Sequence, residues 1–297
     1  MPELPDVEVY VERLRAYVVG QRLQSVRLAS PFVLRSVEPP LQHLYERVTA
    51  DVWRLGKQIV FGFEGDAFLL LHLMIAGRLR LRKPAAPLPA RGALAMLDFE
   101  RCSFLFSEVS KKKRAAMHVL QGRDALADFD RGGLELADAS LDRFKTAMLA
   151  ENHTLKRALT DPRILSGIGN AYSDEILFAA RLSPFKQTHA LDDAQWQCLF
   201  DATRKVLQGW LQRTREAVGE GFPDKVTAFR DGMAVHGRYR QPCPACASPI
   251  QRIVYAENEC NYCARCQTGG RLLADRALSR LLKANWPRTL AELEQRS

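Results

Sequence analysis

Residues 1–6 read MPELPD, and the rest of the chain is organised around this stretch. Removal of Met1 would leave Pro2 as an N-terminal secondary amine, and such an α-amino group titrates near neutrality, so a useful fraction is nucleophilic at physiological pH. The carboxyl group of Glu3 stands beside it as a proton donor or acceptor. From this stretch alone, a solvated terminus without a catalytic function is the simpler interpretation.

A helix is predicted directly after this stretch. Pro5 suits the first turn of a helix, and Gly20 suits its end. The residues of the helical apolar stripe between them are Val7, Tyr10, Val11, Leu14, Tyr17 and Val18. We expect this helix to hold the N-terminus in place instead of letting it fray.

Length, charge and cysteine content bound the class of protein. The 297 residues suffice for two domains and a small appendage. The net charge of +9 favours a polyanionic partner, nucleic acid before membrane, although an indifferent basic surface is the alternative. No apolar stretch approaches the roughly 18 residues of a membrane span, and the N-terminus lacks the layout of a signal peptide, so we expect a cytoplasmic protein.

Short strand-like runs fill the chain from about residue 22 to residue 120. Each run is rich in β-branched, aromatic or leucine residues and is bounded by Gly, Pro or charged turns. The runs lie at residues 24–28, 48–55, 58–63, 67–73, 78–81, 93–99 and 103–106. Their number and spacing predict an antiparallel β-sandwich, which forms an N-terminal domain over residues 1–125.

The hydrophobic period becomes helical from about residue 140, and we assign residues 135–237 to a helical domain. The helical patterns cover residues 141–150, 154–160, 170–181 and 192–214. Gly167 and Gly169 in the connection before the third helix let the backbone approach a ligand, and Asn170 is a natural N-cap. This helix start suits a phosphate group, while a tight turn between packed helices explains it equally well.

Four cysteines in the last third form the pattern CxxC-x16-CxxC. They are Cys243, Cys246, Cys263 and Cys266. Two such pairs suit one tetrahedral Zn²⁺, which holds together a hairpin too small for a core of its own. The ion is structural, because four protein ligands leave no open position. We assign residues 238–267 to a four-cysteine zinc finger; an iron–sulfur site or free thiols are the alternatives.

The last residues, 268–297, form a helical C-terminal extension. Residues 271–286 have a basic amphipathic pattern with leucines near one side, and Pro287 ends it. We expect this helix to pack onto the protein, and the alternative is that it binds a partner.

Three separated motifs together resemble one known family. They are MPELPDVE at the start, GIGNAY at residues 167–172, and the CxxC-x16-CxxC pattern. Their ordered combination is similar to the formamidopyrimidine-DNA glycosylase and endonuclease VIII family over about residues 1–267. The resemblance implies an α+β multidomain fold: a β-sandwich with an N-terminal helix, a helix–two-turn–helix domain and a zinc-finger hairpin.

The resemblance also implies roles for individual residues. Pro2 matches the nucleophile that attacks C1′ of the damaged nucleotide, and Glu3 matches the acid–base carboxylate. Lys57 matches a lysine that contacts phosphate and assists elimination. The pair that grips the flanking phosphates is matched by Lys156 and Asn170. In addition, Glu175 matches a carboxylate that helps to organise the site.

The chain departs from the family pattern at three places. Ile75 stands where the family has a methionine that fills the gap left by the everted base, and it can still act as an apolar wedge. Residues 110–114, SKKKR, replace an Arg-Arg-Phe-Gly loop, so Lys111 and Lys112 favour phosphate contact over recognition of the opposite base. Asn258 replaces an arginine that assists the second elimination, which favours β-elimination over β,δ-elimination.

The function implied is a bifunctional DNA glycosylase and abasic-site lyase of base excision repair. It removes oxidised or ring-opened bases through a Schiff base on Pro2. We expect a monomer that carries one structural Zn²⁺, binds damaged double-stranded DNA and is associated with a bacterial-type nucleoid. The alternative is a non-catalytic or lyase-only protein of the same fold that binds abasic or distorted DNA.

Overall fold

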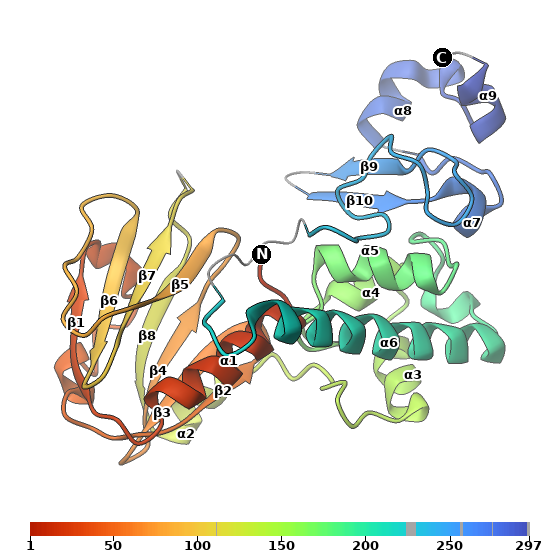
Figure 1. The fold of residues 1–297 in the computed structure, drawn as a ribbon. Helices are drawn as coiled ribbons and strands as arrows, with labels where there is room; N and C mark the ends of the chain where they lie inside the picture. The colour runs from red at the N-terminus through yellow and green to blue at the C-terminus, as the bar shows by residue number, and fades with distance from the viewer. Residues whose placement is uncertain (111, 224–229, 256–257, 275, 296–297) are drawn as a thin grey trace. The chain divides into compact units, whose positions relative to one another are not determined.

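The computed structural model describes residues 1–110, 112–223, 230–255, 258–274 and 276–295. Two compact units make up the chain (Figure 1). The first comprises Met1–Arg131 with the described part of Gly209–Ala228, and the second comprises Gly132–Gln208 with the described part of Phe229–Ser297. The predicted domain limits near residues 125, 135, 237 and 267 stay predictions, because the division into compact units does not test them.

The N-terminal helix α1 spans Leu4–Val18 and confirms the predicted helix. Pro5 lies in its first turn, and Glu3 occupies the N-cap position. The backbone N–H of Glu3 donates to Oδ2 of Asp6 at 2.9 Å, which satisfies a donor at the helix start. Both residues are buried, so the first turn is fixed within the protein.

Two four-stranded antiparallel sheets form the first unit, as the sandwich prediction requires. One sheet has the order β1 (Leu23–Leu28), β6 (Ala93–Phe99), β7 (Ser103–Glu108), β5 (Gly77–Arg82). The other has the order β2 (Thr49–Leu55), β3 (Gln58–Phe63), β4 (Ala67–His72), β8 (Ala116–Gln121). The short helices are η1 (Pro31–Val33), η2 (Leu41–Leu44) and α2 (Arg123–Ala127).

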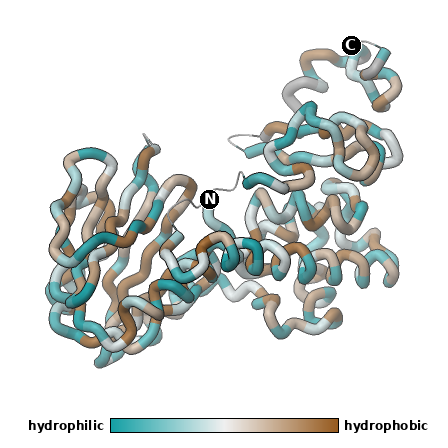
Figure 2. The backbone as a smooth tube through the Cα atoms, in the orientation of Figure 1, coloured by the Kyte–Doolittle hydropathy of each residue, from teal (hydrophilic) through white to brown (hydrophobic). Residues whose placement is uncertain are grey.

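One hydrophobic core joins the two sheets and α1. Figure 2 shows hydrophobic residues along the strands. Four fully buried phenylalanines lie at its centre: Phe61, Phe99, Phe104 and Phe106. The helix contributes Tyr10, whose ring centroid is 5.6 Å from that of Phe222. Burial of these apolar faces anchors α1, and with it the N-terminus, on the sandwich.

The second unit contains the four predicted helices. They are α3 (Leu141–Leu149), α4 (Leu155–Thr160), α5 (Asn170–Ala179) and α6 (Asp193–Val218), with η3 (Thr188–Ala190) before α6. The last turns of α6 belong to the first unit. The predicted N-cap of α5 is wrong by one residue: Gly169 is the N-cap and Asn170 is the first helical residue.

A cysteine-bearing hairpin and the C-terminal extension complete the second unit. The hairpin consists of β9 (Gln251–Tyr255), β10 (Asn258–Tyr262) and the short helix α7 (Ala264–Thr268). The extension consists of α8 (Arg276–Leu282), η4 (Lys283–Asn285) and α9 (Leu290–Glu294). The single helix predicted over residues 271–286 is therefore too long. None of the helices in the described ranges has the length and apolar character to cross a membrane.

The two ends of the extension pack on the hairpin, whereas Leu281 of the predicted helix is exposed. Leu272 and Leu290 are buried against Ile253 and Tyr262 of the hairpin. The backbone N–H of Leu290 donates to the carbonyl of Gly270 at 2.8 Å. These contacts supply an apolar core that a four-cysteine hairpin of this size lacks by itself.

Candidate active site at the N-terminus and a four-cysteine cluster

The N-terminus lies in a partly buried environment that disfavours charge. The structure contains Met1, so the nitrogen of Pro2 is an amide in it, and Pro2 itself is buried. Burial lowers the pKa of the Met1 amine; the Glu3 carboxylate opposes this, and Arg78 and Lys57 lower the pKa further. An amine at this place is thereby kept available as a nucleophile at a lower pH than a solvated one.

Lys57 reaches the same environment from the turn between β2 and β3. Leu55 pairs with Gln58, and Gly56 has φ +61°, as the first position of a type II′ turn requires. Burial lowers the pKa of Lys57 as well, and the Glu3 carboxylate raises it. The structure thus brings together three residues that the sequence predicted: Pro2, Glu3 and Lys57.

His72 belongs to this group, and the sequence did not indicate it. It ends β4 and is the register partner of Gln58, the residue after Lys57. Burial, reinforced by the charge of Lys57, lowers the pKa of His72 to about 4. Its Nδ1 accepts the N–H of Met74 at 2.9 Å, so the neutral ring carries its proton on Nε2. His72 is therefore an uncharged donor near the ammonium group of Lys57.

The predicted wedge and basic loop also lie in the first unit. Ile75 is 54% exposed in the turn between β4 and β5. Lys112 is exposed in the connection between β7 and β8, and Lys111 lies outside the described residues. Their contacts with DNA stay predictions.

In the second unit, Lys156 is held inside the protein. It is 5% exposed, and its Nζ donates to Oδ1 of Asp174 at 2.5 Å, to Oγ of Ser173 at 2.8 Å and to the carbonyl of Asn170 at 2.8 Å. Lys156 therefore fastens α4 to the first turn of α5. Its predicted grip on a phosphate is not tested by this arrangement, but its ammonium group has partners within the protein.

Two buried carboxylates on α5 organise the segments around it. Asp174 accepts from Nδ1 of His236 at 2.8 Å and from the N–H of Asn261 in β10 at 3.1 Å. Glu175 accepts the consecutive backbone N–H groups of residues 234–236 at 2.7, 2.9 and 3.0 Å. Glu175 therefore holds the segment of residues 234–236 against α5, while its predicted role in a DNA-binding site stays a prediction; the parallel position of Asp174 was not predicted.

Asn170 and Asn258 belong to the same part of the second unit. The side-chain amide of Asn170 donates to the carbonyl of Glu259 in β10 at 2.7 Å, so it fastens α5 to the hairpin rather than capping its own helix. Asn258 is exposed at the first residue of β10. Neither position settles a DNA contact.

The four cysteines of the CxxC pairs converge, as their spacing predicts. Their Sγ atoms all lie within 4.8 Å of one another. Cys243 and Cys266 are 3.9 Å apart and Cys246 and Cys263 are 3.5 Å apart, measured between sulfurs. A tetrahedron with metal–sulfur bonds of about 2.3 Å has edges of about 3.8 Å, so these residues fit a tetrahedral cation.

Protons compete with a cation at this cluster. Burial raises the pKa of Cys266 to about 11, so without a cation this thiol keeps its proton at neutral pH. A cation that binds all four sulfurs has to displace such protons, and its binding is coupled to the folding of the hairpin.

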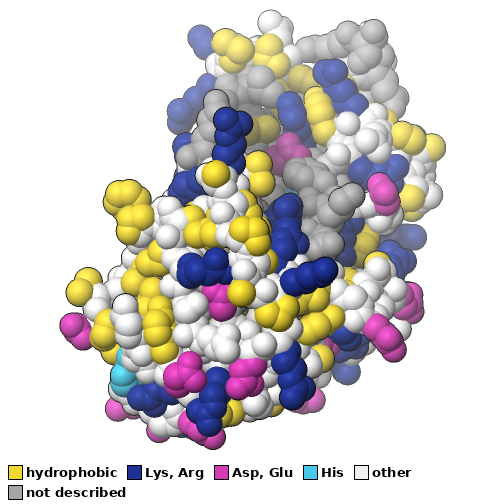
Figure 3. All heavy atoms as spheres, turned by 60° about the vertical axis from the view of Figure 1, so that its left-hand side comes forward, with side chains coloured by type: hydrophobic (Ala, Val, Ile, Leu, Met, Phe, Trp, Pro, Cys, Tyr) yellow, Lys and Arg dark blue, Asp and Glu magenta, His cyan; other side chains and the backbone are white. Residues whose placement is uncertain are grey.

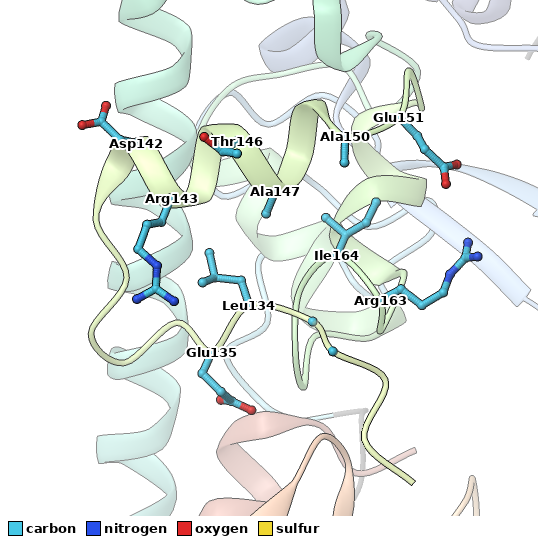
Figure 4. A pocket seen from close by; sticks show the side chains of 12 residues that line it. Leu134, Glu135, Asp142, Arg143, Thr146, Ala147, Ala150, Glu151, Arg163 and Ile164 are labelled. Atoms are coloured by element: carbon cyan, nitrogen blue, oxygen red, sulfur yellow. The ribbon is translucent and has the colours of Figure 1, made fainter. Parts of the chain in front are cut away.

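A separate pocket of about 790 Å³ lies within the second unit (Figure 4). Residues 132–135 and helix α3 form opposite walls, and Arg143, Glu151 and Arg163 are among its charged lining residues. None of the residues predicted to bind DNA or metal lines it.

Comparisons with known proteins assign the chain to a family. The family model for the formamidopyrimidine-DNA glycosylase N-terminal domain matches residues 1–117, and the model for the H2TH domain of the same glycosylase matches residues 135–219. A formamidopyrimidine-DNA glycosylase of Thermus thermophilus is 33% identical over 282 residues, which cover 91% of this chain and 100% of that protein. The chain belongs to the formamidopyrimidine-DNA glycosylase family.

Further comparisons find one more similar sequence and two similar folds. An uncharacterised formamidopyrimidine-DNA glycosylase-like protein of Mycobacterium tuberculosis is 40% identical over 151 residues, 51% of this chain and 94% of that protein. The fold matches MutM in complex with DNA containing carbocyclic 8-oxo-G, with a TM-score of 0.79, 24% identity, and coverage of 90% of this chain and 100% of that one. Fpg of Lactococcus lactis in complex with abasic-site DNA matches with a TM-score of 0.78, 23% identity, and coverage of 90% and 99%.

Proposed function

We propose that this member of the family is a bifunctional enzyme, a DNA glycosylase and abasic-site lyase that acts on damaged double-stranded DNA. Family membership supports the glycosylase activity. The observation that carries the proposal is the environment of the N-terminus, where burial, and after it the charges of Arg78 and Lys57, lower the pKa of the Met1 amine, and where Pro2 and Glu3 are themselves buried. A neutral amine and a carboxyl group are the two groups that such a reaction requires.

The first half of the proposed reaction joins the protein to the sugar. After removal of Met1, the lone pair of the Pro2 nitrogen forms a bond to C1′ of the damaged nucleotide. The bond from C1′ to the base breaks, and the base leaves with the electron pair and takes up a proton, which balances the proton that the Pro2 nitrogen loses to regain its lone pair. Glu3 protonates the ring oxygen, which opens the sugar and leaves an iminium ion between Pro2 and C1′.

The second half cuts the strand. Loss of a proton from C2′ moves its electron pair into a C2′–C3′ double bond, and the C3′–O bond breaks with release of the phosphate. Lys57 lies beside this centre, and its lowered pKa makes it able to take up a proton. Water then hydrolyses the iminium ion and frees Pro2. Asn258 favours a product that keeps the unsaturated aldehyde.

DNA binding in this proposal rests on charge and shape. The net charge of +9 suits a phosphate backbone. On the face drawn in Figure 3, Lys and Arg side chains are interspersed with Asp, Glu and hydrophobic side chains. The sugar carbon is shielded within the stack, so the damaged base must first be everted, with Ile75 entering the gap. We also propose that the protein works as a cytoplasmic, nucleoid-associated monomer.

The cation proposed for Cys243, Cys246, Cys263 and Cys266 is one Zn²⁺. The distances between the sulfurs suit its tetrahedral coordination, and it supplies cross-linking of the hairpin rather than chemistry. The hairpin in turn receives the side chain of Asn170 and the carboxylate of Asp174.

Trapping of the iminium ion with borohydride tests the proposal. The protein without Met1 is incubated with duplexes that contain 8-oxoguanine, formamidopyrimidine, an oxidised pyrimidine or an abasic site, and the reduced complex is separated on a denaturing gel. We expect a covalent complex that is lost in Pro2→Gly and strongly reduced in Glu3→Gln and Lys57→Gln. Lys83→Gln, at an exposed lysine of the first unit, is the matched control and should behave as the unchanged protein. Binding without any covalent complex would establish the non-catalytic alternative.

A further inference from the structure

Helix α5 lies along the open edge of strand β10. In the two-stranded sheet of the hairpin, β9 pairs with one edge of β10, and α5 faces the other edge (Figure 1). At that edge the carbonyl of Glu259 accepts the side-chain N–H of Asn170 at 2.7 Å, and the N–H of Asn261 donates to Oδ2 of Asp174 at 3.1 Å. Two backbone groups of β10 are thereby satisfied without a third strand.

The spacing of these two hydrogen bonds matches the helix to the strand. Asn170 and Asp174 are four residues apart on one face of α5, and four residues of a helix advance by about 6 Å. Glu259 and Asn261 are two residues apart on one edge of β10, and two residues of a strand advance by about 6.7 Å. The two bonds therefore fix the position of α5 along β10. Asn258, the first residue of β10, directly precedes the first of these contacts.

The ammonium group of Lys156 supports this arrangement with all of its hydrogens. An ammonium group has three N–H bonds. Here Nζ donates to Oδ1 of Asp174 at 2.5 Å, to Oγ of Ser173 at 2.8 Å and to the carbonyl of Asn170 at 2.8 Å. A phosphate could be bound by Lys156 only if one of these bonds were broken, and the residue is 5% exposed. The positive charge instead balances the buried carboxylate of Asp174.

We propose that Asp174 and Lys156 are positioning residues, which hold the start of α5 and the start of β10 in the register that DNA binding requires, and that Lys156 makes no phosphate contact. The inference rests on the proposed function, with a phosphate of the damaged strand at the start of α5. The second N–H of the Asn170 side chain and the positive end of the helix suit that phosphate. Without Asp174, Asn170 and Asn258 would both remain but would lose their register.

Equilibrium binding to a duplex that contains a tetrahydrofuran abasic-site analogue tests the inference without requiring any chemistry. The affinity of the full-length protein is measured at several salt concentrations. We expect Lys156→Gln to raise Kd roughly tenfold through misplacement of the contacts. The slope of log Kd against log salt should stay unchanged, whereas a lost phosphate contact lowers it by about 0.9. Lys145→Gln removes the same charge from a surface lysine that pairs with Asp193 at 2.6 Å, and this matched control should change neither quantity.

Replacement of the carboxylate provides the second measurement. Asp174→Asn keeps an oxygen for Lys156 but turns an NH₂ group towards the N–H of Asn261, so the register of β10 is lost. With an abasic duplex and borohydride, we expect the concentration of DNA for half-maximal trapping to rise roughly tenfold, while the trapping rate at saturation stays within about twofold. The double variant Lys156→Gln/Asp174→Asn should bind more tightly than Lys156→Gln, which leaves the carboxylate buried without its cation.

Three results would overturn the inference. They are a salt slope smaller by about 0.9 for Lys156→Gln, an unchanged affinity of Asp174→Asn, and a trapping rate at saturation that falls as far as its affinity. Should Asp174→Asn fail to fold, the salt dependence of Lys156→Gln decides. The predicted binding changes without trapping by any protein, the unchanged one included, would refute the proposed chemistry and leave the positioning role in place. An unchanged protein that does not bind the duplex would overturn both.

Discussion

His72 should make the first unit sensitive to acid. Its pKa is lowered from 6.5 to about 4 in the folded protein, so between these values the unfolded chain binds the proton more readily. The contribution of His72 to the free energy of unfolding is then constant above about pH 6.5, and it decreases as the pH is lowered towards 4. At about 1.4 kcal/mol per pH unit, the full difference corresponds to about 3 kcal/mol, of which about 2–3 kcal/mol is lost between pH 7 and pH 4.5.

Replacement of His72 by Gln removes this titration and keeps an oxygen that can accept the N–H of Met74. Hydrogen exchange of the β3 and β4 amides, corrected for the intrinsic rate at each pH, gives the free energy of opening near His72. We expect that free energy to fall between pH 7 and pH 4.5 by about 2–3 kcal/mol less in His72→Gln than in the unchanged protein. An equal fall in both would refute the idea that a buried, neutral histidine stands beside Lys57.

Three further predictions concern the second unit. Asp174→Ala should lower the free energy of opening of α4 and α5, measured by hydrogen exchange, by about 3–5 kcal/mol, because it leaves the ammonium group of Lys156 buried without its carboxylate. Asp174→Asn should lower this free energy by less. An equal decrease in the two variants would contradict the prediction. If the four cysteines hold the proposed Zn²⁺, a chelator should speed hydrogen exchange in β9 and β10. Leu290→Ala should lower the free energy of opening of the hairpin by about a further 2–4 kcal/mol, while Leu281→Ala, at an exposed leucine, should leave it unchanged. If Asn258 limits the second elimination, the unchanged protein should leave an unsaturated aldehyde on the cut strand and Asn258→Arg should shift the product towards a 3′-phosphate; a clean 3′-phosphate from the unchanged protein would reject this.

Local patterns predicted most elements of the fold. The four helices of the second unit were predicted within a few residues, because their apolar periods and caps are encoded locally; Ser140, for example, caps α3 by accepting the N–H of Arg143. Strand β8 was missed, since its six residues are ordered by pairing with β4 more than by their own composition. The helix of the extension was predicted too long, because Leu272 is buried by the hairpin and not by a helical neighbour.

The residues of the candidate site were predictable where a motif carries them. The spacing of the four cysteines predicted that they converge. The motif at residues 1–6 predicted Pro2 and Glu3 as site residues, and the family resemblance added Lys57. His72 was not predictable, because its place near Lys57 depends on the strand register that pairs it with Gln58. The burial of Lys156 was not predictable either, because a lysine in a sequence suggests a solvated cation. The fold shows that its ammonium group donates to Asp174, Ser173 and the carbonyl of Asn170.

The atom that joins protein to DNA is the centre of the proposal, and mass spectrometry can identify it. The complex formed on an abasic duplex is reduced with borohydride, digested with nuclease and protease, and the peptide that carries the sugar is sequenced. We predict that the adduct lies on the nitrogen of Pro2, in an N-terminal peptide that has lost Met1. An adduct on Lys57 or another lysine, or a processed protein that yields no adduct, would contradict it.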